Sequence, residues 1–276
     1  MHAPTGLPPM HVTPSTLPIA PAVSRLTVSA GRVHFWPGGS LWIGQGSGLS
    51  DWHDHHALQI ALALDGICRF RDMEDGCWSA FTGALVRSHC KHQFEIEGAT
   101  VAHLFIEPET TAGRVLSRHF AAQGISPLPE AERDDMADLL LAAYRRGAGD
   151  DAMVATARAA LALLTNEPLA DDPVDPRIGK ALDYIRTHLH APITLAEAAS
   201  AAALSPGRFR HLFVQETGSA FRAYLLWLRL NAAIQCAMAG QSWTTAAHEA
   251  GFADSAHLTR TFKRMFGINP ATLVRV

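Results

Sequence analysis

The sequence predicts an α+β protein of two domains, an N-terminal antiparallel β-barrel with helices followed by an all-α domain. Short β-type runs occupy residues 25–108, whereas residues 177–276 contain one helical pattern twice. At 276 residues the chain has the length of two domains, and a hydrophobic content of 48% is enough for two cores. No apolar run is long enough for a membrane span, and the N-terminus lacks a secretory signal.

The N-terminal region begins with six prolines within 21 residues, which predict a flexible tail over residues 1–24. Residues 25–165 form the next predicted domain. Its short runs of β-forming residues are separated by Gly, Asp and Pro signals, which is typical of an antiparallel barrel or sandwich. The predicted strands are 32–36, 40–44, 58–64, 68–71, 84–87, 94–97 and 101–106.

Helical patterns follow the predicted strands at residues 113–123, 129–146 and 151–165. The apolar positions of the last two helices could form a dimer interface or pack on the barrel. These positions are Met136, Leu139, Leu140, Leu161 and Leu164. Residues 166–176 hold three prolines and four acidic residues, which indicate an interdomain linker.

The C-terminal region repeats one pattern at residues 194–218 and 242–267, which predicts two helix-turn-helix units. In each copy a Ser or Thr can cap a short helix, and a glycine ends a second helix. Thr194 and Glu197 fit a capping box, and Ser205 precedes a proline that can start the second helix.

Each predicted second helix has a buried stripe and a polar face. The first stripe is Phe209, Leu212 and Phe213, and the second is Leu258, Phe262 and Met265. Away from these stripes lie Arg208, Arg210, His211, Ser255, His257, Arg260, Thr261, Lys263 and Arg264. Such helices suit the DNA major groove, where Arg can bond guanine bidentately. The alternative is an ordinary helical bundle with basic surface helices.

The charge distribution agrees with DNA binding. Residues 175–276 contain 11 Lys and Arg against 6 Asp and Glu, a net charge of +5, although the whole chain carries −3. A surface that binds phosphates needs local positive charge rather than a basic chain.

Residues 178–270 resemble the DNA-binding domain of AraC/XylS-type bacterial transcription regulators. The resemblance rests on Ile193-Thr-Leu-Ala-Glu-Ala-Ala, on Leu204-Ser-Pro-Gly-Arg-Phe-Arg-His-Leu-Phe, and on Ala250-Gly-Phe-Ala-Asp-Ser through Pro270. It implies seven helices, with two helix-turn-helix units joined by a long helix. Carried over by position, the groove-facing residues are Gly207, Arg210, His211, Ser255, Ala256, His257 and Arg260. Ser205 completes the candidate DNA-binding set.

Within the β-rich region, His53-Asp-His55-His56-Ala-Leu-Gln59 with Gly66 resembles the first motif of cupin barrels, with Gln59 in its Glu position. His92 would be the later histidine of that family. Alternation on a strand places His53 and His55 on one face. With Gln59 and His92 they could hold Zn²⁺, Ni²⁺ or Fe²⁺. The alternative is a metal-free barrel mouth that orients an organic effector. No other cofactor is indicated.

Four cysteines form no CxxC pair, which favours reduced thiols in a cytoplasmic chain. Redox sensing by Cys68 and Cys77 is an alternative, because exposed low-pKa thiols can sense oxidants.

We therefore expect a sequence-specific bacterial regulator, gated by a small molecule or metal in the barrel. Its expected partners are double-stranded DNA, that effector, RNA polymerase and a second copy in a homodimer. One competing hypothesis is a metal-dependent cupin enzyme with a DNA-binding tail, in which His53, His55 and His92 are the ligands. Another is a regulator without an effector, whose barrel would be fully packed. The sequence does not give the effector, the operator or the sign of regulation.

Overall fold

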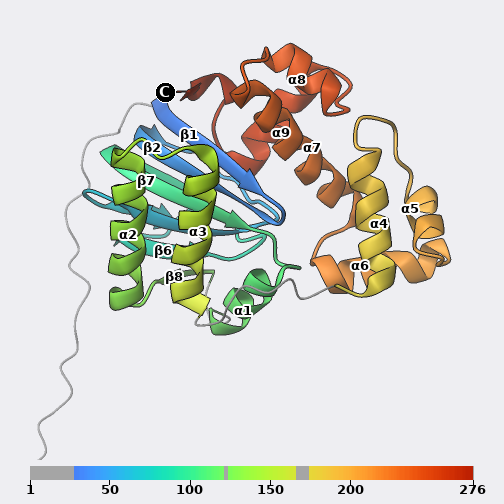
Figure 1. Cartoon of the computed structure of the whole chain (residues 1–276), viewed down its shortest axis with the longest axis horizontal. Helices are drawn as coiled ribbons and strands as arrows, with labels where there is room; N and C mark the ends of the chain where they lie inside the picture. Colours follow the sequence, from blue (N-terminus) through green and yellow to red (C-terminus); the bar gives the residue numbers. More distant parts are fainter. Residues whose placement is uncertain (1–27, 121–123, 166–173, 276) are drawn as a thin grey trace, which may run out of the picture.

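The computed structural model describes residues 28–120, 124–165 and 174–275. The predicted tail (1–24) and residues 166–173 of the predicted linker lie outside these ranges. A sheet-rich N-terminal half is followed by a helical C-terminal half, as the sequence predicts (Figure 1). No helix among the described residues is long and apolar enough to cross a membrane.

One mixed sheet forms the N-terminal half. Its strands are β1 (Val28–Trp36), β2 (Gly39–Leu49), β3 (Leu58–Ala63), β4 (Cys68–Arg71), β5 (Ser79–Phe81), β6 (Gly83–Val86), β7 (Gln93–Ile106), β8 (Ile125–Pro127) and β9 (Leu273–Arg275). The strand order is β8-β6-β3-β7-β2-β1-β9, and β4 pairs with β5 and β7. All pairs are antiparallel except β1 and β9.

The predicted closed barrel is wrong, because the described sheet ends at β8 on one side and β9 on the other. Strand number and spacing do not distinguish an open sheet from a barrel. Here β9, from the C-terminal end of the chain, pairs with the outer edge of β1. The backbone groups of that edge therefore find partners without closure of the sheet. The runs predicted at 94–97 and 101–106 form the single strand β7, which continues through Gly98 at a φ of 63°.

Helices α2 (Glu130–Arg145) and α3 (Asp150–Thr165) lie across one face of the sheet, and α1 (Thr111–His119) packs against α3 below them (Figure 1). Their apolar residues pack against alternate residues of the strands, such as Leu58, Ile60 and Leu104. Of the five positions considered for a dimer interface, Met136, Leu140, Leu161 and Leu164 are buried in this core, while Leu139 is 41% exposed.

The C-terminal half contains α4 (Pro176–Thr187), α5 (Leu195–Ala201), α6 (Pro206–Thr217), α7 (Phe221–Met238), α8 (Trp243–Glu249) and α9 (Ser255–Phe266). In place of a seventh α-helix, the described residues have a 3₁₀ turn at Pro270–Thr272. The predicted caps form: Thr194 and Glu197 make a capping box, and Gly218 and Gly267 end α6 and α9 in left-handed conformation.

The C-terminal helices pack on the other face of the sheet. Trp42 of β2 meets Phe266 of α9 with ring centroids 4.9 Å apart, and Phe105 of β7 contacts both Phe266 and Trp227 of α7. Trp42 and Phe105 alternate along their strands with residues that face α1–α3. Successive side chains of a strand point to opposite faces of the sheet, so one strand contributes to both cores. The sheet thus packs against α2 and α3 on one face and against α7 and α9 on the other, while α4, α5 and α6 lie to the side of it (Figure 1).

Candidate nucleic-acid interface and interdomain site

Helix α6 presents the polar face that the sequence predicts. Phe209 and Phe213 are fully buried, which turns Arg208, Arg210 and His211 to solvent. The Ser205 hydroxyl accepts a hydrogen bond from the Arg208 N–H at 3.4 Å, so this candidate DNA-binding residue caps the helix. Gly207 is exposed, and a Cβ there would meet no heavy atom within 4 Å.

Helix α9 is oriented in the same way by Leu258 and Phe262, which are fully buried. Ala256, Arg260, Lys263 and Arg264 are exposed, and Ser255 and His257 are half-buried. The Asp254 carboxylate caps this helix by accepting from the His257 N–H at 2.6 Å. The expectation that Thr261 lies off the stripe is wrong, because it is only 3% exposed. Its small side chain packs on the same side as the stripe.

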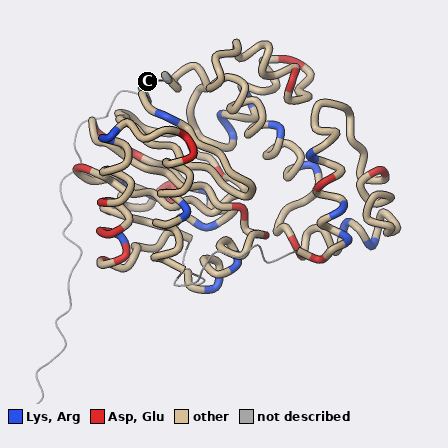
Figure 2. The backbone as a smooth tube through the Cα atoms, in the orientation of Figure 1, with Lys and Arg blue, Asp and Glu red and all other residues tan. Residues whose placement is uncertain are grey.

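Lys and Arg residues occur along the C-terminal helices, whereas α2 at the left edge of the molecule is marked mainly by acidic residues (Figure 2). Both signs occur in each half, so the asymmetry is one of proportion rather than of complete separation (Figure 2).

The histidines of the predicted metal site come together. His53, His55 and His92 each offer a ligand atom, and these atoms lie within 4.8 Å of one another. His53 and His92 face each other across a β-bridge, with N–H···O distances of 3.1 and 2.9 Å. Gln59, the fourth predicted ligand, lies 2.9 Å from the Nε2 atom of His55.

Backbone carbonyls orient all three rings. The Nδ1 atoms of His53, His55 and His92 lie 2.8–2.9 Å from the carbonyl oxygens of Asp51, Ala57 and Cys90. Only a protonated Nδ1 can donate to a carbonyl, so in each neutral ring the lone pair is on Nε2. For His55 this requires the Gln59 amide to present its NH₂ group, rather than Oε1, to Nε2. Metal-binding imidazoles usually donate their other ring N–H in this way. The Nε2 atom of His92 is also buried without a hydrogen-bond partner among the described residues.

Burial keeps these imidazoles neutral. It lowers the pKa of His53 to about 3, and the repulsion that two protonated rings would have at His53 and His55 lowers it further. Burial likewise lowers the pKa of His55 and, still further, that of His92. His103, whose Nδ1 lies 2.9 Å from the Gln59 amide, has its pKa lowered by burial to about 4. Sequence reasoning missed His103, because it lies 44 residues from Gln59.

The segment Asp51–His56 contacts the C-terminal ends of both α6 and α9. At α9, the Asp51 N–H donates to the Gly267 carbonyl at 2.7 Å, and the Asp51 carboxylate pairs with Lys263 Nζ at 2.9 Å. At α6, the Nδ1 atom of His56 lies 2.8 Å from the hydroxyl of Ser219, the residue that follows the Gly218 cap.

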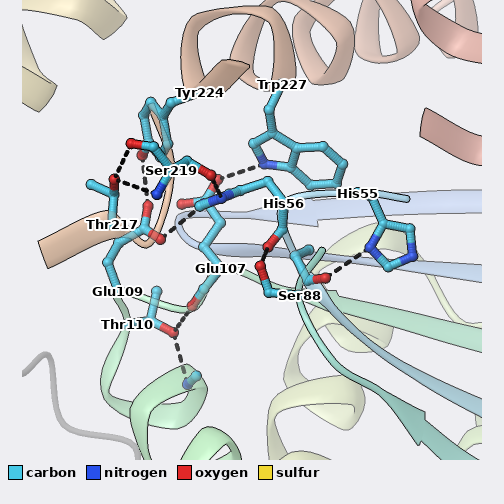
Figure 3. Close-up of polar contacts among 12 residues, drawn as sticks. His55, His56, Ser88, Glu107, Glu109, Thr110, Thr217, Ser219, Tyr224 and Trp227 are labelled. Atoms are coloured by element: carbon cyan, nitrogen blue, oxygen red, sulfur yellow. Dashed lines mark hydrogen bonds and ion pairs between the residues drawn. The ribbon is translucent and has the colours of Figure 1, made fainter. Parts of the chain in front are cut away.

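A buried polar network surrounds the second of these contacts (Figure 3). The Glu109 carboxylate lies 3.1 Å from His56 Nε2 and accepts from the Tyr224 hydroxyl at 2.7 Å. Burial opposes ionisation of Glu109, but the His56 and Tyr224 hydrogen bonds outweigh it and lower its pKa. Neighbouring Glu107 accepts from Trp227 Nε1 at 3.3 Å. Burial, and then repulsion by Glu109, raise the pKa of Glu107 to about 7.

A cavity of about 100 Å³ lies between the sheet and the C-terminal residues from the end of α9 to β9. His53, Gln59 and His103 form a polar part of its wall. The remaining wall is largely apolar, and the C-terminal half contributes Met238, Phe266, Ile268, Leu273 and Val274. Gly44, Gly46 and Gly48 of β2 also line it, and a Cβ at Gly44 would collide with the Ala30 carbonyl of β1.

The cysteines do not combine with this site. All four are free thiols, and burial raises the pKa of Cys68 to about 12. That shift is opposite to the one a redox-sensing thiolate needs. Cys77 is exposed.

Comparisons with known proteins agree with the helical half of this description. A helix-turn-helix domain family matches residues 198–275. The probable transcriptional regulator LumQ of Photobacterium leiognathi is 26% identical over 227 residues, which cover 79% of this chain and 90% of LumQ. The arabinose operon regulatory protein of Escherichia coli is 30% identical over 101 residues, covering 36% of this chain and 35% of that protein.

Among solved structures, the chain is similar to ToxT from Vibrio cholerae O395, with a TM-score of 0.56 and 11% identity. The alignment covers 86% of this chain and 96% of ToxT. At this identity the similarity shows a shared two-domain fold.

Proposed function

We infer that this chain, a DNA-binding transcription regulator of the AraC type, reads DNA through α6 and α9 under the control of an effector. The effector site that we propose is the cavity beneath α9. The proposal is carried by one observation, the contact of the Asp51–His56 segment with the C-terminal ends of both helices.

The proposed DNA readers are the helix-turn-helix units α5–α6 and α8–α9. Their exposed Arg210 and Arg260 are suited to guanine edges, and Arg208, His211, Lys263 and Arg264 to bases or phosphates. The 18 residues of α7 connect the units, and a helix of that length spans about 27 Å. The length of α7 approaches the ~34 Å between major-groove sites one DNA turn apart. Double-stranded DNA is therefore the proposed macromolecular partner.

The cavity volume suggests how an effector could act. A cavity that binds benzene has a volume of about 150 Å³, so about 100 Å³ is too small for most effectors. A larger molecule must move the end of α9 away from the face of the sheet. It would then favour an arrangement in which the readers are held differently, because a ligand stabilises the state that it binds better.

The wall of the cavity indicates the chemistry of that effector. A largely apolar surface with imidazole and amide groups fits an apolar molecule with one polar end. ToxT has also been solved with a bound unsaturated fatty acid. We therefore propose oleate as a first probe, with oleyl alcohol to test the need for a carboxylate.

A divalent metal is a second candidate effector, favoured by the three buried, neutral imidazoles and the unpartnered His92 Nε2. These residues fit a Zn²⁺-type ion after small shifts, since Zn–N bonds are about 2.0–2.1 Å. The ion would tie His92 to the Asp51–His56 segment. Equilibrium dialysis against Zn²⁺, with His92→Ala as the control, should give one equivalent for the natural chain only. Equal, substoichiometric binding by both would end the metal proposal.

Other partners are proposed on the resemblance alone. A homodimer through α2 would have to use the face that exposes Leu139, because the other apolar positions are buried. Contact with RNA polymerase and a place in the bacterial cytoplasm follow from the regulator role. The comparisons give no support to a metal-dependent enzyme. The open cavity disfavours a regulator without an effector.

Selection of bound DNA from a random pool tests the reading function. The full chain should enrich one motif with two half-sites about one turn apart. The double variant Arg210→Ala/Arg260→Ala should enrich none. Failure of the natural chain to enrich a motif would refute sequence-specific reading. Addition of oleate should change the affinity for the selected motif, and unchanged affinity would refute oleate while leaving DNA reading intact.

A further inference from the structure

A second interdomain cavity, separate from the one beneath α9, lies against Glu107. Its volume is about 390 Å³. The turn between β1 and β2 forms one side, and α4 and α7 form the other. A cavity of this size accommodates a small organic molecule.

Two residues that line this cavity each have a buried acceptor without a hydrogen-bond donor among the described residues, which a ligand reaches only if the side chain rotates toward the cavity. The acceptors are Glu107 Oε2 and Asn231 Oδ1. The Glu107 side chain is only 8% exposed, and its other oxygen accepts from Trp227 Nε1. The cation that pairs with it is Arg186, whose Nη2 stands 3.9 Å from Glu107 Oε2, too far for a hydrogen bond.

The charges nearby leave the carboxylate poorly compensated. Glu107 and Glu109 lie in one buried network, and His56 bonds Glu109 rather than Glu107. A buried carboxylate without a close cation is costly, so a cation placed against Glu107 Oε2 would be stabilised. Asn231 Oδ1 offers a second acceptor for the same group or for an adjacent N–H.

The rest of the wall favours an aromatic or apolar body next to that positive charge. Phe35, Trp36, Phe105 and Trp227 line the cavity. Aromatic rings attract cations through their π faces and pack against flat apolar groups. The two unpartnered groups are acceptors, so the complementary ligand groups are donors.

We propose that this cavity binds a small organic ammonium ion, such as an arylalkylamine, with its nitrogen against Glu107 and Asn231. The site shares Phe105 with the lining of the cavity beneath α9, and none of the three clustered histidines lines it. Binding there joins the sensor sheet to α7, the helix between the two DNA-reading units.

Isothermal titration of the full chain with phenethylammonium tests this proposal. The neutral 2-phenylethanol and the anionic 3-phenylpropanoate serve as ligand controls. We expect phenethylammonium to bind at least about tenfold more tightly than either, because a charge-assisted hydrogen bond is worth that ratio. No binding of phenethylammonium at millimolar concentration, or equal binding of the alcohol, would overturn the proposal.

Variants place the ligand. Glu107→Gln should weaken phenethylammonium binding by about tenfold or more, whereas Asp138→Asn, an exposed carboxylate on α2, should leave it unchanged. Arg186→Gln removes the competing cation at the rim and should strengthen binding. Circular dichroism would verify that each variant folds. If Glu107→Gln does not fold, the affinity of Arg186→Gln still tests the proposal. Unaltered affinity in both cavity variants would contradict the assignment. Selection of DNA by the same preparation separates this outcome from failure of the DNA-reading function.

Discussion

The two proposed DNA-reading helices, α6 and α9, meet the N-terminal half through the same segment but by different contacts. The end of α6 is held by side chains, with the Ser219 hydroxyl 2.8 Å from His56 and 2.7 Å from His89. The end of α9 is held by close approach of backbone, through the Gly267 carbonyl, and by the exposed Lys263–Asp51 ion pair. The difference indicates that the α9 contact requires a residue without a side chain at its closest point, Gly267. The α6 contact requires particular hydrogen-bonding side chains.

The two capping glycines should show this difference most strongly. Both have a left-handed φ, 71° at Gly218 and 69° at Gly267. A Cβ at Gly218 would meet nothing within 4 Å, but at Gly267 it would lie 2.6 Å from His53 Nδ1 and overlap Asp51. Gly218→Ala should therefore cost about 1–2 kcal/mol of unfolding free energy from backbone strain alone. Gly267→Ala should cost a further ~1–3 kcal/mol from overpacking. Urea unfolding of the pair checks this, and equal losses would contradict a space-limited α9 contact.

The buried carboxylates beside the α6 contact predict a pH effect. The pKa of Glu107 is raised to about 7 from its ordinary value of 4.5. A raised pKa means that the folded state retains the proton better, so stability is lost as pH rises between these values. The loss should reach about 3 kcal/mol above pH 7 and vanish below pH 4.5.

Glu107→Gln should remove this dependence, so that its stability relative to the natural chain increases from pH 4.5 to 7. Unfolding at several pH values, with Asp138→Asn as the control, measures the difference. A difference in stability that does not change with pH would show that Glu107 has an ordinary pKa. Repulsion between Glu107 and Glu109 would then not destabilise the α6 contact.

The arginines of the two readers should have similar effects on DNA binding despite their different contacts. Arg210→Ala and Arg260→Ala should each cost about 1–3 kcal/mol of specific binding free energy. Arg145→Ala on α2 should cost nothing measurable. Titration of the selected DNA motif provides the measurement. A loss confined to Arg210 would mean that α9, held by its backbone contact, does not enter the groove.

Removal of one hydroxyl should produce the smallest effect. Ser219→Ala deletes the group shared by His56 and His89, and a hydrogen bond of this kind contributes about 1 kcal/mol. Thermal unfolding would register a modest decrease. A loss as large as that for Gly267→Ala would show that both contacts depend on tight packing.

Local signals predicted the helical half well. Caps at Thr194 and Ser205, and the glycines that end α6 and α9, act through neighbouring residues, so spacing in the sequence was sufficient. The histidine cluster could be predicted for a related reason, because His53 and His55 alternate on one short segment.

Long-range pairing could not be predicted in the same way. Nothing near Leu273 indicates that it pairs with Ser29, and no local pattern connects Glu109 with Tyr224, 115 residues away. The open sheet, the polar network and both cavities depend on such contacts. The sequence motifs therefore located the proposed DNA-reading surface, but not the parts that would control it.

The short parallel pairing of β9 with β1 has a consequence for unfolding. It places a strand from the end of the helical half in the sheet of the other half. The helical half cannot detach as a free body without first breaking this pairing and exposing the edge of β1. Heat should therefore unfold both halves in one cooperative transition rather than two, with a single heat-absorption peak in calorimetry.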